Sequence, residues 1–227
     1  MLIKTTLFFF LFINILFTQE NYIDFFLKEY NPKEGDIIFQ DLDSSPLCSA
    51  IEEVTPGIFN QNFSHVGLII RIENKFKIIE SFSNGVKIVE IRDFLIRSLT
   101  DSGVPKITIA RIHKEFQKRH PNLITNAIKK SKDFLDTPYD EKFLLNNNSF
   151  YCSEFIYEIF SQDFDFFNLN KMTFKNKDGI FLKIWVDYFK QLKMKIPEQK
   201  KGINPGIMTL NKNLKFIYNY KTPFEFI

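Results

Sequence analysis

The sequence predicts one α+β domain, and three observations support this fold class. Short runs rich in Ile and Val, separated by turns with Gly and Asn, gather between residues 64 and 112 and are typical of β-strands. Apolar residues recur at helical spacing over 121–135 and again after residue 150. The 227 residues show no internal repeat and no linker long enough to divide them, and this length lets one domain bury a sizeable core.

The segment 1–19 is predicted to be a signal peptide. Lys4 is the only charge before Glu20, and the run 7–17 is apolar apart from one asparagine. This run is shorter than the ~20 residues that span a bilayer, but it suits the hydrophobic region of a signal peptide. The small residues that usually precede a cleavage site are missing, so the alternative that this segment is an uncleaved membrane anchor stays open. We therefore expect an exported protein, periplasmic or extracellular, whose single domain covers 20–227.

Composition excludes several classes of function. The formal net charge is +3 without a basic stripe, so nucleic acid is not an expected partner. The chain has no His-Glu-x-x-His motif, no Cys-x-x-Cys pair and no Gly-rich phosphate loop, so neither a metal nor a cofactor is expected. The 28 Phe are unusual, but they do not form a pattern that predicts a stacking platform.

The predicted elements follow in chain order. A short amphipathic helix is expected within 20–33, a strand at 37–39, and a short helix that begins at Ser45-Pro46 and ends at Pro56. The predicted strands of the central region are 64–72, 75–81, 86–91 and 106–112, with a short helix at 93–97. Then come a helix over 121–135 that starts at Pro121, a loop over 136–148, the helix that carries Cys152, a helix over 181–192, a polar surface loop over 197–211 and a closing strand at 214–220.

Cys152 is the first candidate for chemistry. Ser149 is the expected N-cap of its helix, which places the thiol in the first turn. The N-terminal end of a helix carries partial positive charge and unpaired N–H groups, so a thiol there ionises more easily, and the thiolate is the nucleophile. Two other interpretations stay open: a small buried hydrophobic residue, or a disulfide with Cys48 in an exported protein.

A thiol nucleophile needs a base, and the base needs an orienting group. His65 begins a predicted strand, and Gly67 leaves room for a close approach beside it. If Glu73-Asn74 is a two-residue turn, Glu80 on the next strand shares a sheet face with His65, at ~7–8 Å between backbones. A three-residue turn would send Glu80 to the opposite face.

Each of these two residues also has a purely structural interpretation. His65 could be a histidine whose hydrogen bonds are satisfied locally at the end of a strand, and Glu80 could be a strand-end residue that faces water. Glu90 is a weaker competitor for the orienting role. The other histidines, His113 and His120, flank a junction rich in Lys and Arg and are expected on the surface.

Five motifs then occur in a fixed order: Gly35–Gln40, Ser64–Gly67, Ile79–Ser81 with Gly85-Val86, Pro138–Asp140, and Tyr151–Glu154. Together they resemble the circularly permuted papain-like amidases of the YaeF/YiiX group, which are relatives of the NlpC-type cell-wall endopeptidases. The likeness runs from about residue 35 to 160. The histidine strand comes first and the cysteine helix last, as the permuted group requires.

The resemblance implies a permuted papain-like fold, with an antiparallel sheet packed against helices. It also implies a triad in which Cys152 is the nucleophile, His65 the general base and acid, and Glu80 the group that fixes the imidazole. The reaction would pass through a thioester, with water as the final acceptor. The backbone N–H of Cys152 is a candidate oxyanion donor. Gln40, Tyr139 and Tyr151 are the candidates for the substrate pocket.

Three functions are therefore weighed. The first is an exported cysteine amidase or peptidase that acts on a peptide or amide, with cell-wall peptides as the substrate that the relatives favour. The second is a lipid acyl hydrolase or acyltransferase on the same fold. The third is a non-catalytic binding module, which predicts that Cys152 is oxidised or unreactive.

Overall fold

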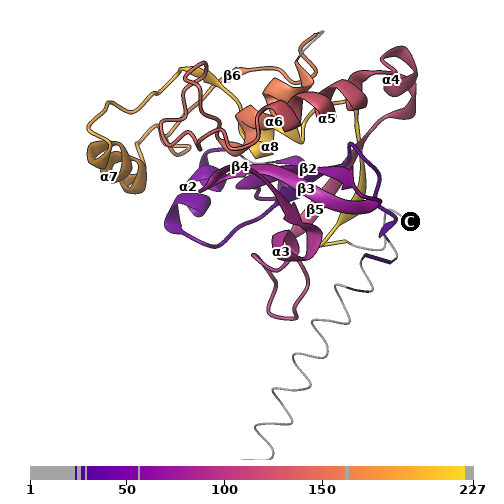
Figure 1. Cartoon of the computed structure of the whole chain (residues 1–227). Coiled ribbons are helices and arrows are strands. Elements are labelled where there is room, and N and C mark those ends of the chain that lie inside the picture. The colour runs from indigo at the N-terminus through magenta and orange to yellow at the C-terminus, as the bar shows by residue number, and fades with distance from the viewer. Residues whose placement is uncertain (1–23, 25–26, 29, 56, 162–163, 223–227) are drawn as a thin grey trace, which may run out of the picture.

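The computed structural model describes residues 24, 27–28, 30–55, 57–161 and 164–222 (Figure 1). The predicted signal peptide and half of the segment 20–33, in which a helix is predicted, lie outside these residues. The centre of the molecule is an antiparallel sheet of six strands in the order β4-β3-β2-β1-β5-β8. Its strands are β1 (Ile37–Gln40), β2 (His65–Ile72), β3 (Lys75–Phe82), β4 (Gly85–Glu90), β5 (Ile107–Ile112) and β8 (Leu214–Asn219).

Helices cover both faces of this sheet, which confirms the α+β class (Figure 1). The helices are α2 (Pro46–Val54), α3 (Ile91–Leu95), α4 (Lys114–Arg119), α5 (Leu123–Asp133), α6 (Cys152–Phe160), α7 (Lys183–Gln191) and α8 (Pro205–Met208), with a 3-10 turn η1 (Ile58–Asn60). Helices α5 and α6 lie along one face and α3 lies on the other, whereas α7 stands at one end of the molecule. The short strands β6 (Asn170–Lys171) and β7 (Lys201–Gly202) form a separate ribbon.

The apolar residues of the sheet alternate between two cores, as the period of a strand requires. On β2, Val66, Leu68 and Ile70 belong to the larger core, which α6 fills with Phe155, Ile156, Ile159 and Phe160. Ile69 faces the opposite way and packs with Ile78 and with Phe94 of α3. Residues of β2 at odd positions, His65 among them, therefore belong to the face that α3 covers.

The β2–β3 hairpin has a two-residue turn, which is one of the two alternatives that the sequence left open. Glu73 and Asn74 have φ values of 47° and 63°, both in the left-handed region that such turns require. The register pairs Ile72 with Lys75 and Leu68 with Ile79. This register places His65 and Glu80 on one face of the sheet.

Several predicted boundaries need correction. Helix α6 is preceded by Tyr151 and not by Ser149 as its N-cap. The hydroxyl of Ser149 donates to Asn147 Oδ1 instead, at 2.7 Å. Phe150 bridges Tyr139 and its N–H donates to the Pro138 carbonyl at 3.0 Å, so the chain is still extended there and the helix starts later.

The prediction of a polar surface loop over 197–211 is wrong. This stretch contains β7 and α8, and it buries Ile203, Pro205, Met208 and Thr209. Its glycines and prolines mask the apolar residues that fill the core. Helix α4 was not expected, Pro121 precedes α5 instead of starting it, and α3 begins two residues before the predicted helix.

Within the described residues, none of the helices combines the length and the apolar character that crossing a bilayer demands.

Two glycines with positive φ offer a matched test of packing at the β3–β4 turn. Gly85 has φ +82°, and a Cβ there would lie 2.2 Å from the Thr137 carbonyl oxygen, whereas Gly179 has φ +76° and open space around it. We expect Gly179→Ala to lower the free energy of unfolding by about 1 kcal/mol, the cost of the left-handed conformation. Gly85→Ala is expected to lower it by about 3 kcal/mol or more, because the overlap adds to that cost. Urea denaturation of both variants measures the difference, and equal losses would contradict the close approach at Gly85.

Candidate active site

Cys152 is the first residue of α6, and its side chain is 5% exposed. The Sγ atom lies 3.8 Å from the carbonyl oxygen of Ser64, the residue that precedes β2. Both Cys48 and Cys152 are free, so the structure does not contain the disulfide that was left open. The thiol therefore sits at a helix N-terminus next to the start of the histidine strand.

The loop before α6 is tied to the sheet, which fixes where the helix begins. The Ser81 hydroxyl donates to the Phe150 carbonyl at 2.6 Å. Asp140 is buried and accepts the N–H groups of Lys142 at 2.8 Å and Leu144 at 2.7 Å. The bond from Ser81 holds the end of the loop against β3, and the two bonds of Asp140 fix the conformation of the loop itself, so together they position Cys152.

Glu154 lies in the first turn of α6 and is also buried. Its Oε2 accepts the backbone N–H of Tyr151 at 3.4 Å, which closes the start of the helix. Burial, with a contribution from the charge of Asp140, raises the pKa of Glu154 to about 8. This residue supports the helix N-terminus, a role that the sequence analysis did not assign.

His65 is buried at the start of β2, with 2% of its surface exposed. Its Nε2 lies 2.5 Å from Oε2 of Glu80, and its side chain is within hydrogen-bonding reach of the Cys152 side chain. Because Nε2 is held by Glu80, Nδ1 is the ring nitrogen left for the thiol. The rings of Phe82 and Phe94 flank the imidazole, with centroids 4.9 Å and 5.6 Å away. The structure therefore brings together the three residues that the sequence analysis singled out.

Gly67 has a specific purpose beside this histidine. A Cβ at this position would lie 2.6 Å from Cγ2 of Ile78 and 3.4 Å from the ring of Phe94. The predicted close approach is thus made by protein side chains. The absence of a side chain at Gly67 leaves room for Ile78, whereas Phe94 would make only an ordinary van der Waals contact with a Cβ there.

Glu80 is 1% exposed, so the alternative of a glutamate that faces water is wrong. Besides His65, it binds Arg97 through two hydrogen bonds, from Nη1 to Oε2 at 2.8 Å and from Nη2 to Oε1 at 2.6 Å. The guanidinium of Arg97 also lies over the ring of Phe82, 4.8 Å from its centroid. The sequence analysis missed Arg97, although a carboxylate on a core strand needs a cationic partner and so gave a signal.

Hydrogen bonds and charges within the group of His65, Glu80 and Arg97 determine the protonation states of His65 and Glu80. Burial lowers the pKa of His65, but the hydrogen bonds to Cys152 and Glu80 and the charge of Glu80 outweigh it and raise this pKa to about 9. Burial alone would raise the pKa of Glu80, yet hydrogen bonds and charge from His65 and Arg97 hold it below its ordinary value. The arrangement thus favours an ionised carboxylate and a protonated imidazole at neutral pH.

Three other candidates lie outside this group. Glu90 is exposed and pairs with Lys77 at 2.6 Å, so it does not compete with Glu80. His113 is the N-cap residue of α4, and His120 packs on the rings of Phe116 and Phe164.

The prediction that Gln40 belongs to the substrate pocket needs a correction, because Gln40 is not among the residues that line the cavity beside the thiol. It pairs directly with His65 across the β1–β2 ladder, so both side chains point to the face that α3 covers. There its Nε2 donates to the Phe94 carbonyl at 2.8 Å.

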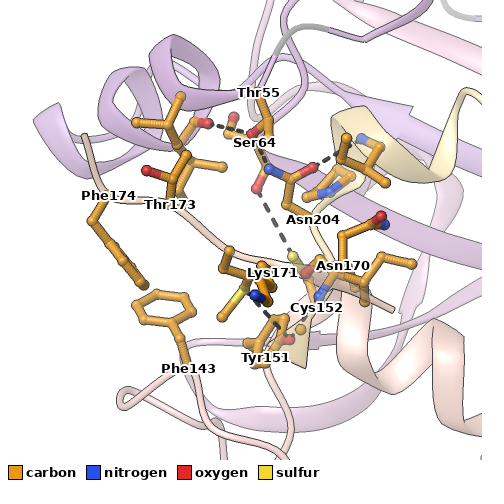
Figure 2. A pocket seen from close by; sticks show the side chains of 18 of the residues that line it. Thr55, Ser64, Phe143, Tyr151, Cys152, Asn170, Lys171, Thr173, Phe174 and Asn204 are labelled. Carbon is orange, nitrogen blue, oxygen red and sulfur yellow. Dashed lines mark hydrogen bonds between the residues drawn. The ribbon is translucent and has the colours of Figure 1, made fainter. Parts of the chain in front are cut away.

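A cavity of about 310 Å³ opens beside Cys152 (Figure 2). Tyr139 and Tyr151 are among the residues that line it. Burial raises the pKa of Tyr139 well above its ordinary value. The hydroxyl of Tyr151 accepts the N–H of Ile203 at 3.2 Å. Much of the remaining wall comes from the region after Ser161, for which the sequence gave no function, including Met172, Phe174, Trp185, Ile203 and Ile207.

Among the described residues, no group of three or more His, Cys, Asp or Glu side chains is arranged to hold a metal ion.

Comparison with known proteins identifies relatives of this chain. Residues 31–218 match the model of a family described as permuted papain-like amidase enzyme, YaeF/YiiX, C92 family. The solved structures include a similar one, the crystal structure of the metalloprotein YiiX from Escherichia coli O157:H7. It is 19% identical, with a TM-score of 0.66 over 83% of this chain and 97% of that chain, which shows a shared fold. A search of curated proteins found no match.

Glu80→Gln tests the electrostatics of the imidazole. Since the carboxylate raises the pKa of His65 to about 9, the neutral amide should let the imidazole lose its proton at lower pH. The raised pKa means that His65 contributes stability fully below pH ~6.5 and loses it as the pH rises through 9. NMR titration of the His65 ring measures the midpoint. Glu90→Gln is the matched control, because its exposed carboxylate should leave the midpoint unchanged. An equal midpoint in all three proteins would refute the coupling.

Arg97→Ala leaves Glu80 buried without its main cation. We expect a loss of about 3 kcal/mol in the free energy of unfolding at pH 7, as for a broken buried ion pair. Arg97→Lys should be intermediate, since an ammonium group cannot form both parallel bonds. The pKa of Glu80 is lowered in the folded protein, so the loss should shrink as falling pH protonates this carboxyl.

Arg71→Ala is the control for Arg97→Ala, because Arg71 also lies over a phenylalanine ring, Phe76, at 4.6 Å. It should cost less than about 1 kcal/mol. Chemical denaturation at several pH values measures all three variants, and equal losses at positions 71 and 97 would count against the pairing with Glu80.

Proposed function

The chain belongs to the permuted papain-like amidase enzymes of the YaeF/YiiX group, C92 family, and on this premise we propose that it is an exported cysteine hydrolase that cleaves an amide bond. One arrangement carries the proposal: the Cys152 thiol is within reach of His65, whose Nε2 lies 2.5 Å from the buried Glu80. Nucleophile, base and orienting group thus follow one another in hydrogen-bonding order.

In the proposed mechanism, the proton of the thiol already lies on His65 Nδ1, which accounts for the protonated imidazole that the raised pKa favours, and the Sγ thiolate of Cys152 attacks the carbonyl carbon of the amide. The oxyanion that forms accepts the N–H of Cys152, which has no acceptor within the helix because it belongs to the first turn. The imidazolium then gives its proton to the nitrogen of the leaving amine, and the C–N bond breaks. This leaves a thioester on Cys152.

Water completes the reaction. His65 takes a proton from water, the resulting hydroxide equivalent attacks the thioester, and the carboxylic acid leaves as the C–S bond breaks, which restores the Sγ thiolate beside the protonated imidazole. Glu80 stays ionised throughout, because Arg97 balances its charge, and it holds Nε2–H so that Nδ1 remains directed at the sulfur. Glu80 and Arg97 therefore position the imidazole.

Export and substrate are further parts of the proposal. The predicted signal peptide at 1–19 supports export, with an uncleaved anchor as the other possibility. Cell-wall peptides follow from the likeness to NlpC-type endopeptidases. The second candidate, an acyl hydrolase or acyltransferase, is favoured by one observation, the apolar and aromatic side chains around the cavity. The binding module remains the third.

Thiol alkylation tests the nucleophile. We expect iodoacetamide to modify Cys152 ~10-fold or more faster than Cys48 near neutral pH, because only Cys152 has an imidazole partner. Cys48 is an internal control, since it is buried like Cys152 but its Sγ is hydrogen-bonded to the hydroxyls of Ser44 and Ser45, each at 3.5 Å. Peptide mass spectrometry across a pH series measures both rates.

His65→Ala should remove the advantage of Cys152 while leaving the rate at Cys48 unchanged. Equal labelling of the two cysteines in the native protein, or no reaction at Cys152, would refute the proposed nucleophile and favour the binding module.

A further inference from the structure

The nearly balanced charge of the whole chain conceals an uneven distribution. The segment 170–201 contains nine lysines and three acidic residues, a net charge of +6, and since the whole chain carries +3, the rest carries −3. Among the described residues, Lys183 alone of these nine lysines has an ion-pair partner, Asp187. The electrostatic field of the protein therefore directs this part of the molecule toward an anionic surface.

An open hollow on the surface beside α7, which stands at one end of the molecule, gathers part of this charge around apolar side chains (Figure 1). Its volume is about 680 Å³. Its lining includes three lysines and several apolar residues, among them Lys190, Lys193, Lys195, Val186, Met194 and Ile196. We call it the α7 hollow.

Two large apolar side chains at the α7 hollow stay open to water. Val186 is 43% exposed, and Ile180 is 63% exposed. Ile180 directly precedes Phe181, another lining residue of the hollow. Exposed apolar side chains that gather at one place, with charged groups around them, mark a surface that binds a partner.

The chemistry of the α7 hollow fits an anionic lipid bilayer. Lysine ammonium groups are attracted to the phosphates of lipid head groups, while apolar side chains between them enter the boundary between head groups and acyl chains. The segment 170–201 contains no arginine, although the chain has arginines elsewhere. Arginine is the residue that recognises carboxylates and nucleic acids through paired hydrogen bonds, so a lysine-only surface favours a diffuse anionic surface as the partner.

A second basic hollow lies elsewhere on the surface and serves as a comparison. It has a volume of about 410 Å³, and Lys33, Lys114 and Lys215 are among its lining residues. Its apolar lining residues, Ile112 and Ile217, are buried and half-buried. The second hollow therefore has the positive charge without the exposed apolar side chains.

We propose that the α7 hollow docks the protein on the surface of an anionic lipid bilayer. Lys190, Lys193 and Lys195 lie against the head groups, and Val186 enters the layer between them. This inference does not rest on the proposed Cys152 nucleophile, because no residue of the triad lines the α7 hollow.

Helix α7 also connects the α7 hollow to the catalytic cavity. Phe189 lines the hollow, and Trp185, one turn earlier on the same helix, lines the cavity. The two rings are stacked, with centroids 6.0 Å apart. Docking through the α7 hollow therefore holds the catalytic cavity close to the bilayer.

Vesicle co-sedimentation tests the docking. The probe is the mature chain 20–227, which contains every residue that the structure describes. We expect vesicles of phosphatidylglycerol and phosphatidylcholine in equal amounts to bind it at least ~100-fold more tightly than vesicles of phosphatidylcholine alone. Raising the ionic strength from about 0.1 M to about 1 M should abolish most of this preference, because the screening length falls from ~10 Å to ~3 Å.

Two outcomes of this experiment would overturn the inference. The first is equal binding, or no binding, to the two kinds of vesicle. The second is tighter binding to a duplex DNA oligonucleotide than to the anionic vesicles at the same ionic strength, which would make nucleic acid the partner.

Neutralising the rim tests the lysines. The triple variant with Lys190→Gln, Lys193→Gln and Lys195→Gln should bind anionic vesicles ~100-fold more weakly, because each lysine near such a surface contributes about fivefold in affinity. All three side chains are exposed, so the urea midpoint should stay unchanged and shows that the variant is folded.

The matched control removes the same charge from the second hollow. Lys33→Gln, Lys114→Gln and Lys215→Gln are also exposed substitutions, and together they should weaken vesicle binding by less than about fivefold. Equal losses in the two triple variants would show that net charge alone drives the binding, which contradicts docking through the α7 hollow.

Val186→Gln tests the apolar part of the α7 hollow. It should weaken binding to anionic vesicles roughly tenfold, because the apolar side chain no longer leaves water on docking. Leu210→Gln is the control, since Leu210 is 53% exposed but lines neither hollow, and its binding should match that of the native chain. An unchanged affinity in Val186→Gln would contradict insertion of this face into the bilayer.

Discussion

The site depends on one buried carboxylate. A charge as enclosed as that of Glu80 is tolerated in a protein interior only when it is paired and hydrogen-bonded. Arg97 supplies the opposite charge through two parallel bonds, and the oxygen Oε2 still accepts a further bond from His65. The pairing that offsets the cost of burying the Glu80 charge therefore also orients the imidazole of His65 and leaves its Nδ1 for Cys152. The phenylalanines on either side of the ring add rigidity to this orientation.

The topology explains why the thiol and the imidazole meet at the end of a strand. His65 points to the face of the sheet that α3 covers, whereas α6 packs on the other face. A cysteine in the middle of α6 would be separated from the imidazole by the backbone of the sheet. Because His65 is the first residue of β2 and Cys152 the first of α6, the two side chains meet beyond the strand end, where Sγ lies 3.8 Å from the Ser64 carbonyl.

Local rules account for what the sequence predicted. The turn at Glu73-Asn74 fixed the parity of β2 and β3, and so the shared face of His65 and Glu80, from two residues alone. Arg97 was not predictable in the same way, since it reaches Glu80 from beyond α3 and no periodicity connects them. The N-cap at Tyr151 depends on the bridge between Tyr139 and Phe150, and the burial of apolar residues such as Ile203 and Met208 within 197–211 depends on packing against distant elements. Both are tertiary effects that overrule local propensity.

The triad and the cavity wall occupy different parts of the chain, and this separation has a chemical consequence. His65, Glu80 and Arg97 lie on or next to β2, β3 and α3, whereas much of the wall comes from the loop before α6 and from the region after Ser161. Cys152 alone belongs to both, as the atom that attacks and as part of the wall. An apolar wall beside the sulfur also limits the water that can weaken the pairing of thiol and imidazole. A substrate group that fills the cavity would therefore bring the neighbouring carbonyl carbon to the sulfur and exclude water from one side of the reacting atoms at the same time.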